Sequence, residues 1–145
     1  MTLTTVLCPL DFSAASAALV TYAAALAIAS GAELRLLHVQ EAQPVLAAAG
    51  STPAPSVAEQ LGLHRAVAEQ SGARVSTAVL QGDAATQIVA EAGRYPADLI
   101  VIGAHGKTGL TRFLMGSTAE AVVRTAPCAT LLVKPSPVTE YRESA

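Results

Sequence analysis

Near the end of the chain, residues Leu99 to Thr118 read LIVIGAHGKTGLTRFLMGST. The stretch begins with an unbroken run of apolar, mostly β-branched residues, which is typical of a strand buried on both faces of a parallel sheet. Glycines follow, and Gly116-Ser117-Thr118 opens a segment with the pattern of a helix that continues to Thr125. A strand, a glycine-rich loop and a helix in this order indicate an α/β fold.

The glycine-rich part of this stretch has the outline of a phosphate-binding loop. Glycine lets the backbone approach a ligand closely, and the first N–H groups of a helix attract anions. A P-loop needs a glycine five residues before the glycine of its Gly-Lys-[Ser/Thr] end, which here would be Gly106-Lys107-Thr108. Val101 occupies that position, so the spacing excludes a P-loop. It also excludes the dinucleotide fingerprint, because Gly103, Gly106 and Gly109 are evenly spaced. A connection that only turns the chain remains an alternative.

The rest of the chain alternates between apolar strands and helices. The patterns predict strands at 5–10, 33–39, 74–80, 99–102 and 129–133, and helices at 14–29, 57–71, 84–94 and 117–125. Such alternation predicts an α/β fold with a single open five-stranded parallel sheet and helices on both faces. For this Rossmann-like sheet we expect the strand order 3-2-1-4-5. One domain would span residues 1–135, followed by a polar tail at 136–145.

Short polar residues mark the ends of several of these elements. Ser13 is the predicted N-cap of the first helix and Asp83 that of the third. Asp11 ends the first strand, where it could either cap the helix or face a ligand at the carboxyl edge of the sheet. Asp98 precedes the glycine-loop strand, and we expect it to anchor a turn.

Composition narrows the classes of function. Hydrophobic residues make up 52% of the 145 residues, aromatic residues 3%, and the net charge is −2. A nucleic-acid-binding protein would show a basic face, and a flavoprotein would need aromatic residues to stack its ring. No basic leader precedes the first strand, and the alanine-rich span from Ala14 to Ala29 is short for a membrane helix. We therefore expect a cytoplasmic protein without a nucleic-acid or membrane partner, with Cys8 and Cys128 as reduced, buried thiols.

The stretch from Gly103 to Thr118 resembles the nucleotide loop of the universal stress protein family. The ATP-binding branch of that family carries G-x2-G-x9-G-[S/T] at this point, and the chain matches it without a gap. Two further segments carry the resemblance, namely Pro9 to Asp11 at the end of the first strand and His38-Val39 at the end of the second. Cys8 departs from the family pattern, where a branched aliphatic residue is usual.

The resemblance implies a site for ATP, or for ADP or AMP, with Mg²⁺ accompanying the triphosphate. Adenine would lie near Leu10 and Val39, ribose near Asp11, and the phosphates over the glycines and the helix start. The expected nucleotide-binding residues are Pro9, Leu10, Asp11, Val39, Ile102, Gly103, Gly106, Gly116, Ser117 and Thr118. The resemblance also implies a homodimer that pairs the last strand, Ala129 to Val133, with Leu131 and Val133 near the two-fold axis.

The expected function is a nucleotide-sensing stress or regulatory module, with at most weak ATPase or autokinase activity. No residue is assigned to catalysis or to a protein-held metal, and His38 is interpreted as a packed histidine. The roles of His105, Lys107 and Arg112 stay open. One alternative is a dimeric interaction protein with a vestigial loop, and another is a slow ATP-dependent enzyme. Against an adenylating enzyme, the segment after the first strand lacks the H-x-G-H and serine-glycine motifs.

Overall fold

The computed structural model describes residues 3–41, 55–104 and 116–134. The elements follow one another as β1 (Thr5–Pro9), α1 (Ser16–Ser30), β2 (Glu33–Gln40), α2 (Val57–Gln70), β3 (Val75–Gln81), α3 (Ala84–Arg94), β4 (Leu99–Gly103), α4 (Ser117–Thr125) and β5 (Ala129–Val133). The middle of the glycine-rich loop, with Gly106, His105, Lys107 and Arg112, and the expected tail at 136–145 lie outside the described residues.

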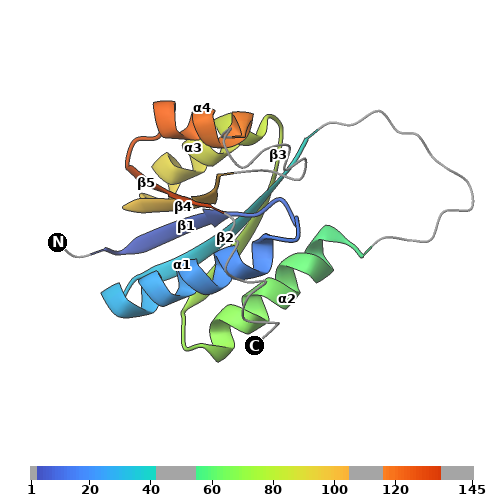
Figure 1. Cartoon of the computed structure of the whole chain (residues 1–145), viewed down its shortest axis with the longest axis vertical. Coiled ribbons are helices and arrows are strands. Elements are labelled where there is room, and N and C mark those ends of the chain that lie inside the picture. Colours follow the sequence, from blue (N-terminus) through green and yellow to red (C-terminus); the bar gives the residue numbers. More distant parts are fainter. Residues whose placement is uncertain (1–2, 42–54, 105–115, 135–145) are drawn as a thin grey trace, which may run out of the picture.

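The strands form one parallel sheet in the order β3-β2-β1-β4-β5, which confirms the predicted fold class and strand order (Figure 1). β1 lies in the middle, where Val6 is paired with Leu34 of β2 and with Leu99 of β4. The chain builds β2 and β3 on one side of β1 and then returns for β4 and β5 on the other side. This reversal creates a topological switch point between β1 and β4, where ligands bind in open α/β sheets.

Two helices cover each face of the sheet (Figure 1). Val6 and Cys8 of β1 belong to the core beneath α1 and α2, whereas Leu7 belongs to the core beneath α3 and α4. Successive side chains of a strand point to opposite faces, so a strand covered on both sides must be apolar throughout. This explains why the central strands appear in the sequence as unbroken apolar runs.

The start of α1 differs from the prediction. The helix begins at Ser16 instead of Ala14, and its N-cap is Ala15, which makes no side-chain cap. The predicted cap at Ser13 was therefore wrong. The reason is a turn that precedes the helix, in which Asp11 Oδ1 accepts a hydrogen bond from the Ser13 N–H at 3.0 Å.

Two other polar predictions agree with the structure. Asp83 caps α3 by accepting a hydrogen bond from the Thr86 N–H at 3.0 Å. Asp98 anchors the entry into β4, because its Oδ2 accepts hydrogen bonds from the N–H groups of Thr4 at 2.6 Å and Thr5 at 3.1 Å. The Thr4 hydroxyl also donates to this oxygen, at 2.7 Å. Together the three bonds lower the pKa of Asp98, and those from the Thr4 side chain and N–H have the largest effect. They also join the start of β1 to the start of β4.

A buried ion pair, which the sequence did not predict, lies between the sheet and α3. Arg35 of β2 donates from Nε to Glu91 Oε2 at 2.8 Å and from Nη1 to Ser76 Oγ at 3.0 Å. Its guanidinium also lies over the ring of Tyr95, 3.7 Å from the ring centre. Glu91 lies in α3 and Tyr95 is the C-cap of that helix, whereas Ser76 lies in β3, so the arginine links β2, β3 and α3.

The cysteines are free thiols. Cys8 is buried in the core, and burial raises its pKa strongly. Cys128 is half-buried, which corrects the expectation that both would be buried. Its pKa is raised by burial and, to a lesser extent, by the nearby charge of Asp98.

Candidate functional site

A cavity of about 530 Å³ opens at the carboxyl ends of the strands. It is lined by residues at or just after the carboxyl ends of β1, β2, β4 and β5 and by residues near the starts of α1, α3 and α4. Its position coincides with the switch point between β1 and β4, and its volume is within the range of about 300 to 1,000 Å³ typical of small-molecule sites.

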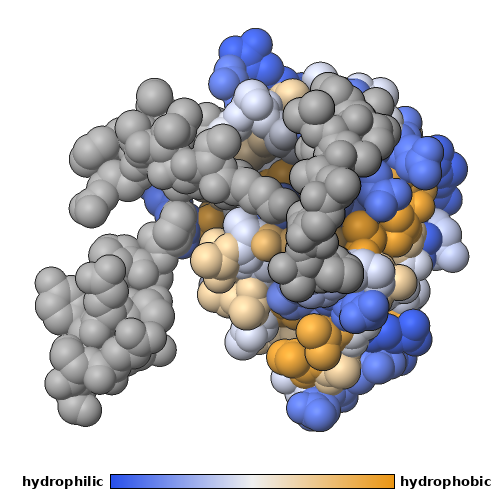
Figure 2. Space-filling view, turned by 90° about the vertical axis from the view of Figure 1, so that its right-hand side faces the viewer, coloured by the Kyte–Doolittle hydropathy of each residue, from blue (hydrophilic) through white to orange (hydrophobic). Residues whose placement is uncertain are grey.

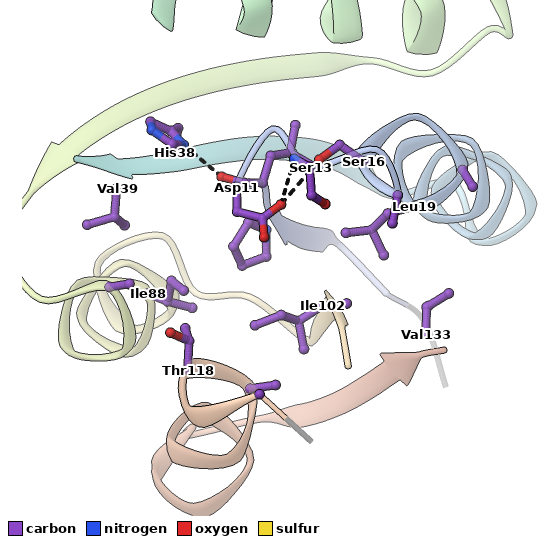
Figure 3. A pocket seen from close by; sticks show the side chains of 18 of the residues that line it. Asp11, Ser13, Ser16, Leu19, His38, Val39, Ile88, Ile102, Thr118 and Val133 are labelled. Carbon is purple, nitrogen blue, oxygen red and sulfur yellow. Dashed lines mark hydrogen bonds between the residues drawn. The ribbon is translucent and has the colours of Figure 1, made fainter. Parts of the chain in front are cut away.

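Asp11 supplies a carboxylate to this cavity from the loop after β1. Its Oδ1 accepts hydrogen bonds from the Ser13 N–H at 3.0 Å and from Ser16 Oγ at 3.4 Å (Figure 3). Both bonds are made by Oδ1, so within the described residues they leave Oδ2 available to a ligand. The carboxylate thus both shapes the turn before α1 and faces the cavity.

The backbone around Asp11 has an unusual conformation. Phe12, the next residue, has a φ of 59°, and it is the only non-glycine residue with a positive φ in the described part of the chain. Leu10, the preceding residue, is buried, and its N–H donates to the Leu37 carbonyl at 2.7 Å. The chain therefore leaves the sheet at Leu10 and turns sharply at Phe12, with the carboxylate between them.

His38 at the end of β2 contacts both neighbours of Asp11. Its Nδ1 lies 2.7 Å from the Leu10 carbonyl oxygen, and its ring stacks on the Phe12 ring with 4.3 Å between the centres. Because a carbonyl oxygen can only accept, Nδ1 carries the proton in this bond. His38 was expected to be a packed strand-end histidine, and it is packed, but against the loop that holds Asp11.

The opposite wall of the cavity is the start of α4. In the view of Figure 3, Thr118 lies across from Asp11, with Ile102 of β4 beside it. Gly116 is the N-cap of α4 and provides no side-chain cap, while its own N–H donates to the Ala104 carbonyl at 2.7 Å. The first N–H groups of α4 therefore have no capping side chain from this residue and can receive an anion.

Charged residues of both signs border the cavity. Among the described lining residues these are Asp11, Glu41 and Lys134, which follows β5. Lys134 was not among the expected site residues, because a lysine after the last strand has no distinguishing local pattern. Within the described ranges no group of three His, Cys, Asp or Glu residues could hold a metal ion.

The expected site residues converge on this cavity. Of the ten, all except Gly106 lie in the described residues, and these nine all line it: Pro9, Leu10, Asp11, Val39, Ile102, Gly103, Gly116, Ser117 and Thr118. That they contact a nucleotide stays a prediction. Ser13, Ser16 and His38 also line the cavity and were not among the expected site residues. His38 belongs to a segment that carries the family resemblance, whereas Ser13 and Ser16 lie beyond Asp11, in the turn and at the start of α1.

Comparison with known proteins identifies related sequences and structures. Residues 2–134 match the model of the universal stress protein family. A universal stress protein of Methanocaldococcus jannaschii is 46% identical over 76 residues, which are 52% of this chain and 45% of the relative. The matched segment thus spans less than half of that relative.

Two solved structures extend the likeness over nearly the full chain. A universal stress protein of Lactobacillus plantarum is 30% identical with a TM-score of 0.68, covering 92% of this chain and 99% of the other. A universal stress protein in complex with cAMP is 25% identical with a TM-score of 0.74, covering 94% of this chain and all of the other.

Proposed function

The chain belongs to the universal stress protein family, and we propose that it binds an adenine nucleotide, with ATP as the ligand, to sense nucleotide state in stress regulation. The observation that carries the proposal is the convergence of nine expected residues on one cavity at the switch point of the sheet. The complex of a structural relative with cAMP supports the adenine part of the ligand.

The walls of the cavity suggest how the nucleotide would lie. Adenine would lie near Leu10 and Val39, two apolar residues of the lining. The ribose faces the Asp11 carboxylate, which can accept hydrogen bonds from its hydroxyls. The phosphates lie at the start of α4, where the free N–H groups and the positive end of the helix dipole favour an anion. Gly103 and Gly116 add no side chain at that end of the cavity.

Mg²⁺ would accompany the triphosphate. Because the described residues provide no cluster of metal ligands, the phosphate oxygens and water would have to hold the ion. The protein would then recognise the charge-neutralised triphosphate rather than bind Mg²⁺ on its own. Binding of Mg²⁺ should accordingly require nucleotide.

The residues that line the cavity favour a binding module over a fast enzyme. Asp11 is held by Ser13 and Ser16, and the His38 Nδ1 proton is directed at a backbone carbonyl. These bonds commit Asp11 Oδ1 and His38 Nδ1 to shaping the loop, and we expect the remaining oxygen of Asp11 to face the ribose rather than the phosphates. We therefore expect hydrolysis or autophosphorylation, if any, to be slow.

Calorimetric titration of nucleotide-free protein with ATP, with and without Mg²⁺, tests the proposal. The matched variants are Gly116→Val in the cavity and Gly93→Val on α3, where an added Cβ meets nothing within 4 Å. Gly116 has φ −63° and ψ 151°, which valine adopts without strain, so Gly116→Val adds bulk beside the phosphates without distorting the backbone.

We expect wild type and Gly93→Val to bind alike and Gly116→Val to bind at least about tenfold more weakly, a loss of about 1.4 kcal/mol. GTP should bind more weakly than ATP. A folded, nucleotide-free wild type that binds no adenine nucleotide would refute the proposal. It would leave an interaction protein whose glycine-rich loop only connects β4 to α4.

A further inference from the structure

The strained residue of the described chain follows Asp11 directly. A left-handed backbone is unfavourable for a non-glycine residue, so it persists only where surrounding contacts hold it. Phe12 has such a backbone and is partly buried against the core beneath α1 and α2. Its ring stacks on His38 at 4.3 Å and lies parallel to the ring of His64 at 6.1 Å.

His38 contacts Leu10 and Phe12, the residues on both sides of Asp11. It donates from Nδ1 to the Leu10 carbonyl at 2.7 Å and lies against the Phe12 ring, while Asp11 stands between these two residues. The backbone on either side of Asp11 is thereby fixed to the end of β2. Figure 3 shows His38 and Asp11 on the same side of the cavity, joined through this segment.

The interior of the turn is fixed by Asp11 itself. Because Ser13 and Ser16 both donate to Oδ1, rotation of the carboxylate would break two hydrogen bonds. The hydrogen bonds of Asp11 set the direction of its carboxylate, and the contacts of His38 set the position of its backbone. Both are needed to hold one oxygen toward the cavity at hydrogen-bonding distance from a ligand.

We propose that His38 is a positioning residue, which acts through the Leu10 carbonyl and the Phe12 ring to aim the Asp11 carboxylate at the ribose hydroxyls. This inference rests on the proposed function. It makes His38 responsible for discrimination between a nucleotide with ribose hydroxyls and one without them. The bond to Leu10 is made by neutral imidazole protonated at Nδ1 and by imidazolium alike, so the discrimination does not depend on the charge of His38.

The test compares the affinities for Mg-ATP and Mg-2′,3′-dideoxy-ATP, an analogue without either ribose hydroxyl. Three variants separate the contacts of His38. His38→Phe keeps a ring against Phe12 but has no donor, His38→Asn keeps a donor close to the position of Nδ1 but has no ring, and His38→Ala removes both. Asp11→Ala removes the carboxylate, and thermal unfolding establishes that each variant is folded.

A matched control is His64→Ala. His64 also faces the Phe12 ring, but at 6.1 Å, and it makes no bond to Leu10 within the described residues. This substitution removes a histidine that faces the Phe12 ring and leaves the contacts of His38 with Leu10 and Phe12 in place. We expect it to keep the preference for ATP.

We expect wild type to prefer ATP by about tenfold or more, as for loss of a hydrogen bond to a charged group. Asp11→Ala and His38→Ala should each lose most of that preference, and the double variant should lose little more. His38→Phe and His38→Asn should each lose part of it. Non-additivity of this kind is the signature of two residues acting as one unit.

Other outcomes overturn the inference in distinguishable ways. If wild type prefers ATP and His38→Ala retains the full preference, His38 does not position Asp11, while the proposed function stands. If His38→Ala weakens the binding of both nucleotides equally, His38 likewise does not position Asp11. It would then support only the cavity as a whole. If wild type binds ATP without preference over the analogue, Asp11 does not recognise ribose. If it binds neither, the proposed function fails together with this inference.

Discussion

Glu91 is a carboxylate with only 3% of its surface exposed, yet it bonds to two arginines. Its Oε2 accepts from Arg35 Nε at 2.8 Å, and its Oε1 accepts from Arg94 Nη2 at 3.0 Å. Burial by itself raises the pKa of Glu91, but the hydrogen bonds and positive charges of Arg35 and Arg94 outweigh it and leave the pKa lowered. The folded protein therefore favours the charged form of Glu91.

Replacement of Glu91 by alanine should destabilise the protein at pH 7 by about 3 to 5 kcal/mol, because it leaves the buried Arg35 without its partner. A lowered folded pKa means that the charged form stabilises the protein fully above the ordinary value of 4.5, and that this stability disappears as the pH falls through the folded pKa. The difference between wild type and Glu91→Ala should therefore shrink below pH 4.5. Urea unfolding at pH 7 and at steps below pH 4.5 measures it.

The control for this prediction is Glu120→Ala. Glu120 pairs with Arg124 at 2.9 Å on the exposed face of α4, one helical turn away. Exposed pairs of this kind contribute about 0.2 to 1 kcal/mol. Similar losses in the two variants, or a loss in Glu91→Ala that is the same at every pH, would contradict the buried role of Glu91.

At the scale of the elements, the helices differ in how their ends are stabilised. α2 begins with a side-chain cap, in which Ser56 Oγ accepts from the Glu59 N–H at 3.0 Å and donates to Glu59 Oε1 at 3.2 Å. α1 has no side-chain cap at its start but ends at Gly31, whose φ of 73° suits glycine. α2 also buries few residues, namely Leu61 and Ala68. Its stability should depend strongly on the cap.

Ser56→Ala should therefore lower the free energy of unfolding by about 1 kcal/mol, the usual cost of a lost N-cap. Ser56→Asp should retain most of the stability, because its carboxylate can accept the same N–H. Ser71→Ala at the far end of α2, where the exposed hydroxyl donates to the Val67 carbonyl at 3.3 Å, should change the stability by less than about 0.5 kcal/mol. Chemical unfolding followed by circular dichroism compares the three, and equal effects of Ser56→Ala and Ser71→Ala would argue against the cap.

The bounds of the elements show what local patterns can predict. The residues of α3, α4 and β5 agree with the expectation, because apolar periodicity and adjacent Gly, Pro and Asp residues mark both ends. The start of α1 was misjudged, since its position follows from the turn at Phe12, whose ring packs against His38 of a different strand. The pair of Arg35 and Glu91 was not predictable either. Its members lie 56 residues apart, and no local pattern connects them.

The lining of the cavity was predicted more completely than the helix ends, whereas its contacts with a nucleotide stay a prediction. Its residues follow the ends of strands, and parallel strands bring their carboxyl ends to one edge, so the sequence order alone assembles them. The contacts of His38 could not be predicted in this way, because they depend on the angle of a ring and on a positive φ at Phe12. Spacing predicts which residues meet, whereas side-chain geometry decides what they do to one another.

At the scale of the whole molecule, the sheet has two edges, formed by β3 and β5. β3 and β5 each have one neighbouring strand. The hydrophobic residues on the surface are divided among separate elements, and Figure 2 shows them on one face as small groups with hydrophilic residues between them. In the described residues no helix is long and apolar enough to cross a membrane. Self-association through β5, which the family resemblance implies, stays a prediction.

If β5 pairs across a two-fold axis, as we expect, a charge on it should dissociate the dimer. Leu131→Glu places a carboxylate in that strand, and Val79→Glu places one in β3, where Val79 is 44% exposed. We expect sedimentation velocity to show a dimer for wild type and Val79→Glu and a monomer for Leu131→Glu. A monomeric wild type, or dissociation by both substitutions, would remove β5 from the interface. Thermal unfolding of each variant checks that it is folded.

The order of the strands has a consequence for synthesis. β1 leaves the ribosome first, but its neighbour on one side, β4, is made much later, with Leu99 paired to Val6. The cavity needs still more, since its lining extends from Pro9 to Lys134. A nascent chain that stops before β4 contains the β1–β2–β3 half of the sheet but lacks the residues of β4, α4 and β5 that complete the lining of the cavity. If the cavity binds the proposed ligand, capture would therefore require translation to proceed through α4, and shorter products would not compete for that ligand.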